Sequence, residues 1–446
     1  MSDPTANSRQ GESNQRKPAL SENVLYQLSS SPRPIHLSAP DVGAAERDAL
    51  LAALDSNWTG SEKPAAEELE TGLRHVTGAD AAVALASGTA ALHLGLIALG
   101  VSSGDLVILP TLAPIESANA VRYVGAKPMF VDCDPKTGNI DPHLLRMALR
   151  GLANGERRPA AVMIVDAYGS CADYSRIETI CNYYRIPIIE DASASLGATH
   201  AGRPAGSFGA LAAVSFDNDR LVTGGGGGAL IGSRHMIERA RYLANQAQRP
   251  TLHFAGDDLG YSYQLSNLLA AVASAQLNRL GQIVERTRSL NARYASIMSM
   301  IPGVSLLDID NDGFGNGWLS VACIDQDKHP TPQAIATRMA VDGIEVRPAH
   351  KPLHLRGALA EQVRVGGAAA EYHCATALSL PSGASMTDFD QERVISSLLR
   401  ALRPSPDPLS AVIDLKPEIN LDPEIDVRSA QPQQHRESQP PTQRAA

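Results

Sequence analysis

Residues 212–231 read AAVSFDNDRLVTGGGGGALI: an apolar run, a polar segment, five consecutive glycines and a second apolar run. Ala212–Phe216 and Ala229–Ile231 are short and lack a regular polar alternation, which predicts two strands buried on both faces. The glycines at 224–228 are not a P-loop, because no Gly-Lys-Ser/Thr sequence follows them. They predict a tight turn at which the backbone packs closely.

Similar apolar runs lie on the N-terminal side of this stretch. The predicted strands are Leu106–Leu109, Pro128–Asp132, Ala161–Ala167 and Ile186–Glu190. Helical patterns lie between them, at Ala90–Leu99 and Tyr174–Tyr184. Strands that alternate with helices favour an α/β fold with a mainly parallel sheet and helices on both faces.

The pattern changes beyond this stretch. The sequence of Asp258–Leu280 predicts a long segment that leads into an Ala/Leu-rich helix. After residue 290 the predicted strands are Val304–Asp308, Trp318–Ile324 and Ile344–Arg347, and the predicted helices are Pro332–Val341 and Asp388–Leu402. We therefore expect four regions: a disordered segment at 1–33, a large domain at 34–290, a small α/β domain at 291–403 and a disordered, Pro-rich tail at 404–446.

Composition excludes several classes of protein. The 446 residues are 43% hydrophobic and 20% charged, with a formal net charge of −9, which argues against a nucleic-acid-binding protein. No apolar run reaches the length of a membrane-spanning helix, and the polar N-terminus does not resemble a secretory signal. Five scattered cysteines without a C-x-x-C motif indicate reduced thiols rather than a disulfide frame or metal site. We expect a cytoplasmic protein.

Ser87-Gly88-Thr89 closes one apolar run and opens a helix. Free N–H groups at a helix N-terminus, together with a hydroxyl, can bind an anion. Taken alone, the motif is a weak signal for an anion site and is more typical of a simple helix cap. Asp191, in Ile189-Glu190-Asp191-Ala192-Ser193, has two interpretations as well, as a ligand-binding carboxylate at a strand end or as a cap of a following helix.

Several segments together resemble the DegT/DnrJ/EryC1/StrS sugar aminotransferases, and the resemblance extends from residue 36 to residue 402. The segments are residues 87–89, 125–132, 189–193, 213–228, 260–268, 347–354 and 380–383. The resemblance implies a fold-type-I aminotransferase, with a large domain built on a seven-stranded, mainly parallel sheet and a small C-terminal domain. It also implies pyridoxal 5'-phosphate as cofactor and a nucleotide-sugar as ligand.

The resemblance assigns roles to individual residues. Gly88 and Thr89 would hold the cofactor phosphate, Asp191 would hold the pyridinium N–H, and Ser215 is the serine five residues before the cofactor lysine. Four other cofactor-facing positions depart from the family pattern. They are Arg220 in place of the Schiff-base lysine, Pro114 in place of a ring-stacking aromatic residue, Ala194 in place of a polar residue, and Ser262 in place of an asparagine that reaches the partner's phosphate.

Arg220 carries the functional prediction. A Schiff base needs a neutral primary amine, whereas a guanidinium stays protonated. No lysine lies between Lys136 and Lys328, and Lys351 is at a position that lies toward the substrate in the family. The resemblance therefore implies a relative of the nucleotide-sugar aminotransferases that lacks transaminase activity and acts as a scaffold, a partner or a ligand-binding protein. The alternative is an enzyme that uses a non-covalently bound cofactor.

The resemblance also implies a dimer, because the segment around Ser262 crosses to the partner's pocket in the family. We expect a homodimer or a heterodimer with an active relative. In the tail, residues 415–420 (LKPEIN) are nearly repeated at 421–426 (LDPEID). Alternating apolar residues and prolines suit an extended peptide that binds a partner, although an idle disordered tail explains them equally well.

Overall fold

The computed structural model describes residues 33–56, 63–153, 158–248, 258–310 and 312–403. The two terminal segments predicted to be disordered, including the repeat at 415–426, lie outside the described residues. Within the described part, no helix has the length and apolar character needed to cross a membrane. All five cysteines are described, and all are free thiols.

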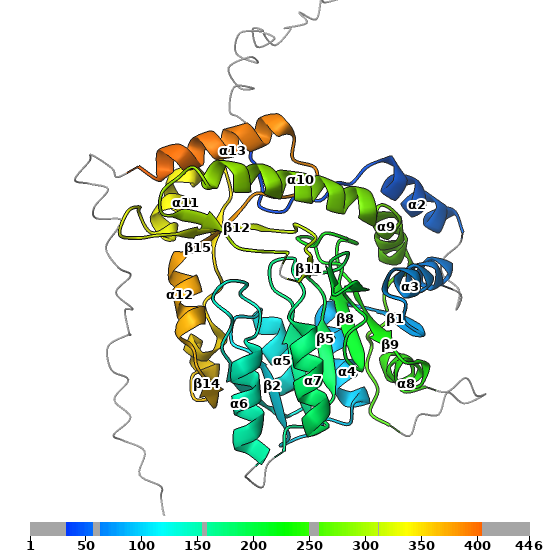
Figure 1. Cartoon of the computed structure of the whole chain (residues 1–446). Helices are drawn as coiled ribbons and strands as arrows, with labels where there is room; N and C mark the ends of the chain where they lie inside the picture. The colour runs from blue at the N-terminus through cyan, green and yellow to red at the C-terminus, as the bar shows by residue number, and fades with distance from the viewer. Residues whose placement is uncertain (1–32, 57–62, 154–157, 249–257, 311, 404–446) are drawn as a thin grey trace, which may run out of the picture. The chain divides into compact units, whose positions relative to one another are not determined.

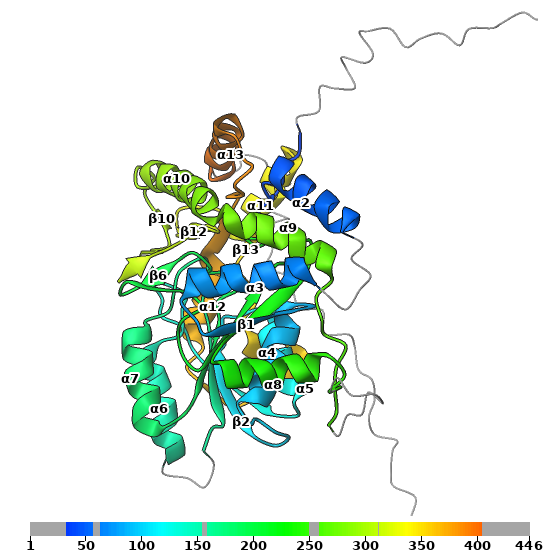
Figure 2. The same cartoon turned by 90° about the vertical axis from the view of Figure 1, so that its right-hand side faces the viewer.

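An eight-stranded sheet forms the centre of the fold (Figures 1 and 2). Its order is β1 (Ala81–Leu85), β9 (Gly228–Gly232), β8 (Leu211–Ser215), β5 (Ile188–Asp191), β4 (Ala161–Val165), β2 (Leu106–Pro110), β3 (Lys127–Val131) and β14 (Arg364–Val365). Only β9 runs antiparallel to its neighbours. The mainly parallel sheet is thereby confirmed, but it has eight strands rather than seven, because β14 adds to the edge of β3.

The strands are buried on both faces, as their apolar runs predict. All five residues of β4 are buried. One face packs against α4 (Gly88–Ala98), α5 (Ile115–Tyr123) and α8 (Arg234–Ala244). The other face packs against α3 (Pro64–Thr77), α6 (Pro142–Ala153), α7 (Tyr174–Tyr184) and α9 (Asn267–Asn278). Helix α2 (Ala44–Asp55) packs against α9.

A second, antiparallel sheet has the order β10 (Val304–Leu306), β12 (Ser320–Ile324), β15 (Ala377–Leu380) and β13 (Arg347–Pro348). Its core includes residues of α10 (Leu280–Met298), α11 (Pro332–Val341) and α13 (Asp388–Ala401). Three short strands form a third sheet: β11 (Gly313–Phe314), β6 (Thr199–His200) and β7 (Arg203–Pro204).

Most predicted elements differ from the structure by at most two residues at either end, and two differ more. The strand predicted at Ile344–Arg347 starts only at Arg347, because Ile344 pairs instead with Ile35 from the N-terminal part of the chain. The helix predicted within Asp258–Leu280 starts at Asn267, where the Ser266 hydroxyl accepts a hydrogen bond from the N–H of Leu268, and it ends at Asn278. The first difference arises from a contact between residues far apart in the sequence, and the second from the Ser266 cap.

The C-terminal part of the chain is attached to the large sheet at α12 (Ala368–Thr376) as well as at β14. The Asp132 carboxylate, directly after β3, accepts hydrogen bonds from the N–H groups of Gly367, Ala369 and Ala370. A carboxylate at a helix N-terminus satisfies free N–H groups and interacts favourably with the helix dipole. These contacts place residues 347–370 close to the ends of the central strands.

Candidate active site

A pocket of about 530 Å³ lies where β2, β4, β5 and β8 end. Open α/β sheets bind ligands at the carboxyl ends of their parallel strands. Residues on the second sheet or next to its strands complete its walls; they include Trp318 before β12, Arg347 on β13 and His350 after β13. Of the eight predicted site residues, seven line the pocket: Gly88, Thr89, Pro114, Asp191, Ala194, Ser215 and Arg220.

The N-terminus of α4 forms one wall of the pocket. The Ser87 hydroxyl accepts a hydrogen bond of 3.0 Å from the N–H of Ala90, so it caps the helix. Gly88 and Thr89 follow the cap and face the cavity. The cap interpretation and the anion-site interpretation are therefore compatible, because the cap uses only one of the first free N–H groups.

Close packing explains the glycines around this wall. A Cβ atom on Gly88 would lie 2.8 Å from the Cβ of Ser215, and one on Gly228 would lie 2.5 Å from the Gly88 nitrogen. Gly225, Gly226 and Gly227 have positive φ angles of 75°, 138° and 102°. The N–H groups of Gly224 and Gly226 both donate to the Phe216 carbonyl. The five glycines form the predicted tight turn between β8 and β9.

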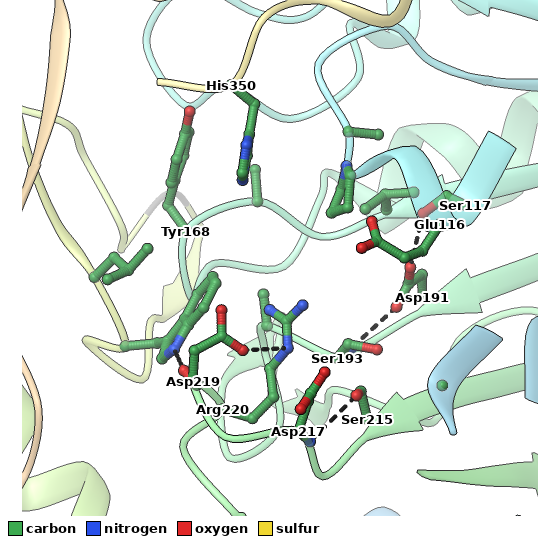
Figure 3. Close-up of a pocket in the computed structure, with 18 of the residues that line it drawn as sticks. Glu116, Ser117, Tyr168, Asp191, Ser193, Ser215, Asp217, Asp219, Arg220 and His350 are labelled. Carbon is green, nitrogen blue, oxygen red and sulfur yellow. Dashed lines mark hydrogen bonds and ion pairs between the residues drawn. The ribbon is translucent and has the colours of Figure 1, made fainter. Parts of the chain in front are cut away.

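Asp191 ends β5 and is only 5% exposed. Its carboxylate accepts hydrogen bonds from the Ser117 hydroxyl (3.1 Å) and from the N–H of Ser193 (3.2 Å) (Figure 3). The residues directly after it form turns rather than a helix, so the helix-cap interpretation of Asp191 is wrong. The structure instead presents this carboxylate to the pocket.

Arg220 lies on the loop after β8, and its guanidinium points into the pocket (Figure 3). Its Cζ lies 4.8 Å from the centre of the Trp318 ring, within the range of a cation–π interaction. Its Nε lies 3.5 Å from Asp219 Oδ1, near enough for an ion pair but without the alignment of a hydrogen bond. The backbone of Asp219 is fixed in turn, because its carbonyl accepts bonds from Trp318 Nε1 and the Ser38 hydroxyl.

The remaining predicted positions offer little to a ring-shaped ligand. Pro114 precedes α5 and has no aromatic face. Ala194 has no side-chain donor, and its carbonyl accepts a hydrogen bond from Asn316. Ser262 does not line the pocket but is exposed and pairs with Asn245. Its predicted role in the pocket of a partner subunit stays a prediction, because the structure contains a single chain.

The structure also brings together pocket residues that sequence reasoning missed. Asp166, directly after β4, accepts hydrogen bonds from Ser195, Tyr174 and the N–H of Ala172. Burial, together with the neighbouring Asp191, raises the pKa of Asp166 to about 7, despite these donors. A sequence signal existed, because Asp166 is a carboxylate at the end of an otherwise apolar predicted strand.

His350 reaches the pocket from the segment after β13 (Figure 3). Partial burial lowers its pKa, and the guanidinium groups of Arg356, Arg220 and Arg347 lower it further, against an opposing contribution from Glu116. The imidazole is therefore mainly neutral at neutral pH, although part of the side chain is exposed to solvent.

The residues that line the pocket do not fit a cofactor held through a Schiff base. Lys63, Lys127, Lys136, Lys328 and Lys351 are the lysines of the described chain, and none of them lines the cavity. The α4 N-terminus and Asp191 fit the phosphate and ring nitrogen of pyridoxal phosphate, but the pocket presents no primary amine among the described residues. No group of three or more metal-binding side chains is placed together in the described ranges either.

The family model of the DegT/DnrJ/EryC1/StrS aminotransferases matches residues 40–399. The chain belongs to this family. Two relatives of this DegT-family protein cover most of its length. EpsN of Bacillus subtilis (strain 168), named as a pyridoxal phosphate-dependent aminotransferase, is 36% identical over 82% of this chain and 95% of its own. GDP-perosamine synthase of Caulobacter vibrioides is 31% identical over 84% of this chain and 100% of its own.

A solved structure confirms the predicted architecture of the DegT-family chain. DesI, crystallised in the presence of its TDP-sugar product, superposes with a TM-score of 0.76 over 83% of this chain and 94% of its own, at 27% identity. The predicted fold-type-I aminotransferase fold is thus confirmed. The family relationship places this protein among the nucleotide-sugar aminotransferases by homology.

Proposed function

We propose that this protein binds a nucleotide-sugar but does not catalyse transamination. One observation carries the proposal: Arg220 occupies the expected lysine position, points into the pocket, and has no lysine beside it among the described lining residues. Transamination needs an amine that forms a Schiff base and then moves a proton between carbon atoms. A guanidinium performs neither step, because it does not release its proton.

The relatives support the ligand class. GDP-perosamine synthase is named for a nucleotide-sugar product, and DesI was crystallised with a TDP-sugar. The pocket of about 530 Å³ falls within the size range of small-ligand sites. We propose that the chain forms a homodimer, or pairs with an active relative, and contributes a binding site rather than a catalytic one.

A spectroscopic experiment tests the proposal. Purified protein is mixed with excess pyridoxal phosphate, washed, and examined for a visible absorbance band before and after borohydride treatment. We expect no protein-linked band in the washed protein and, by peptide mapping, no covalent adduct on a pocket residue, because the pocket lacks the amine. Adducts on lysines outside the pocket do not count. The same protein is assayed for amino transfer from glutamate to keto-sugar nucleotides, with an active relative as the control. Robust turnover by the wild-type chain would overturn the proposal.

Two features favour a second candidate, an enzyme with a non-covalently bound cofactor. Asp191 and the α4 N-terminus remain in the arrangement that would hold a pyridinium nitrogen and a phosphate. The spectroscopic experiment distinguishes the two functions. A cofactor that co-purifies or binds reversibly without borohydride sensitivity, together with turnover, supports this second candidate.

A further inference from the structure

The guanidinium of Arg220 is held in place by protein contacts, whereas its two terminal nitrogens remain available to a ligand. Trp318 lies against its guanidinium at 4.8 Å, and Asp219 faces its Nε at 3.5 Å. Among the described residues, none accepts a hydrogen bond from its two terminal nitrogens. The side chain is only 17% exposed, so this free end faces the cavity rather than bulk solvent.

The other two pocket arginines are already engaged by the protein. Arg347 directs its Nε and a terminal nitrogen at Glu345 Oε1, at 3.0 and 2.7 Å. Arg356 donates its Nε to the Lys351 carbonyl at 3.1 Å. His350 is mainly neutral, for the reasons given above. The terminal nitrogens of Arg220 and Arg356 therefore both lack a hydrogen-bond acceptor among the described residues. Arg220 differs from Arg356 because the Trp318 ring, 4.8 Å from its Cζ, fixes its guanidinium inside the cavity.

A planar guanidinium with two free terminal nitrogens matches the geometry of a carboxylate, which accepts two parallel hydrogen bonds. The charge of the surroundings favours a carboxylate over a phosphate at this position. The acidic residues of the lining are Glu116, Asp166, Asp191, Asp217, Asp219 and Glu345. Beside these acids, and with Asp219 already paired with Arg220, a singly charged carboxylate adds less negative charge than a doubly charged phosphate.

The acids also indicate what the rest of the ligand contains. Glu116 and Asp217 face the same space as the guanidinium (Figure 3). Carboxylates accept hydrogen bonds, so a ligand rich in hydroxyl groups supplies the donors that they need. The N-terminus of α4, which also lines the pocket, offers a separate site for the phosphates of a nucleotide.

We propose that Arg220 binds the carboxylate of a sugar acid, and that the ligand of this pocket is a nucleotide-linked uronate rather than a neutral sugar. The nucleotide part of this inference rests on the proposed function, whereas the role of Arg220 in binding a carboxylate does not. The substitution that removes the Schiff-base amine would thus create a specificity for the acid form of the sugar.

Paired ligands that differ by one carboxylate test the proposal. The probes are UDP-glucuronate against UDP-glucose, and free glucuronate against glucose, measured by calorimetry and thermal shift. Glutamate serves as a carboxylate that is not a sugar. We expect about tenfold tighter binding of the acid in each sugar pair, the size of a charge-assisted hydrogen-bond contribution. We expect glutamate to bind no more tightly than glucose.

Three variants assign the preference to Arg220. Arg220→Met should remove the preference while leaving the packing against Trp318, and Arg220→Lys should retain part of it, since it keeps a charge but loses the planar pair of nitrogens. Arg203→Met is the matched control. Arg203 also lies over an aromatic ring, at 4.4 Å from Phe208, and pairs with an acid, Glu178, but it lies outside the pocket. This control should keep the wild-type preference.

The outcomes separate the inference from the proposed function. Equal binding of UDP-glucuronate and UDP-glucose in wild type and Arg220→Met would overturn the inference and leave nucleotide-sugar binding intact. An Arg220-dependent preference for free glucuronate, without binding of either nucleotide, would support the carboxylate role and overturn the nucleotide ligand. Tighter binding of glutamate than of glucuronate, or the absence of any Arg220-dependent preference, would overturn the inference.

Discussion

The two walls of the pocket are held in place by different kinds of contact. On the α4 wall, Gly88 and Gly228 lie so close to neighbouring backbone and Ser215 that no side chain fits. On the Arg220 wall, formed by the loop after β8, the guanidinium is held by one ring and one carboxylate. The α4 wall would therefore persist whatever the pocket binds, because the fold requires it. The Arg220 wall can change its chemistry without disturbing the sheet, so function is better inferred from this wall.

The largest effect concerns catalysis. We predict that neither the wild type nor Arg220→Lys transfers an amino group from glutamate to keto-sugar nucleotides above background, whereas an active relative does so under the same conditions. Restoring the amine leaves Pro114 without an aromatic face, Ala194 without a hydrogen-bond donor, and Ser262 shorter than asparagine. Several lost contacts of about 1 kcal/mol each weaken cofactor binding by orders of magnitude. Turnover by the variant alone would show that the Arg220 position by itself separates this chain from active relatives.

The next prediction tests the packing of the α4 wall. Gly228→Ala should lower the free energy of unfolding by about 3 kcal/mol or more, because its Cβ would lie 2.5–2.6 Å from the Gly88 nitrogen, the Ser87 carbonyl carbon and the Val214 oxygen. Gly225→Ala is the matched control. Its Cβ has no atom closer than 4.0 Å, so only its φ of 75° carries a cost, of about 1 kcal/mol. Urea denaturation measures both, and equal losses would contradict the packing argument.

A third prediction concerns Asp166, between the two walls. Its pKa is about 7 in the folded protein and near the ordinary value of 3.8 when unfolded, so the folded state holds an extra proton between these values. Stability should therefore fall as pH rises from 4 toward 7, by up to about 1.4 kcal/mol per pH unit for one proton. Buried Glu190, whose pKa is also raised by burial, adds to the same trend.

Asp166→Asn should flatten this dependence in denaturation experiments across that pH range. The asparagine oxygen can still accept hydrogen bonds from Tyr174 and the N–H of Ala172. Asp173→Asn changes the partly buried N-cap of α7 and provides a comparison outside the pocket. An unchanged pH slope in Asp166→Asn would show that Asp166 does not hold the extra proton.

The smallest effect concerns Trp318. Trp318→Leu removes both the ring beneath Arg220 and the bond from Nε1 to the Asp219 carbonyl, so the guanidinium should lose part of its fixed orientation. We expect the preference for UDP-glucuronate over UDP-glucose to fall about threefold, in line with a cation–π contribution of about 0.5–1 kcal/mol. Trp318→Phe keeps a ring and should lose less. Equal losses in the two variants would assign the effect to the hydrogen bond alone, because both variants lack Nε1 and only phenylalanine keeps a ring.

Local pattern was sufficient to predict much of the fold. Tyr174–Tyr184 and Pro332–Val341 are helices with the predicted bounds, because apolar spacing and a first-turn cap determine them locally. Elements that depend on distant partners were not predicted. β1 was not identified as a strand, although it pairs with β9 at the sheet edge, and β14 consists of two residues that are extended only because β3 lies beside them.

The residues of the site also fall into two groups, those that could be predicted from the sequence and those that could not. Gly88 and Asp191 lie at ends of regular elements and Arg220 lies on the loop after β8, and the family resemblance located all three. Trp318 and His350 come from segments far along the chain, and their packing against the pocket follows from tertiary contacts that no local pattern records. Asp166 was not predicted as a site residue, although it is the one carboxylate in the predicted strand Ala161–Ala167. The apolar residues of this run were sufficient to predict a strand, so the carboxylate was given no role.

The attachment of residues 347–370 to the large sheet has a consequence for the speed of ligand exchange. The N–H of Leu353 donates to the Thr111 carbonyl, Val363 and Val365 accept bonds from β3 and from Asp132, and Asp132 holds the start of α12. The wall that carries His350 and Arg356 is thus fastened on both sides to a rigid sheet. A ligand would then enter a preformed cavity, and its association rate would be governed by diffusion and side-chain rotation rather than by closure of one domain on the other.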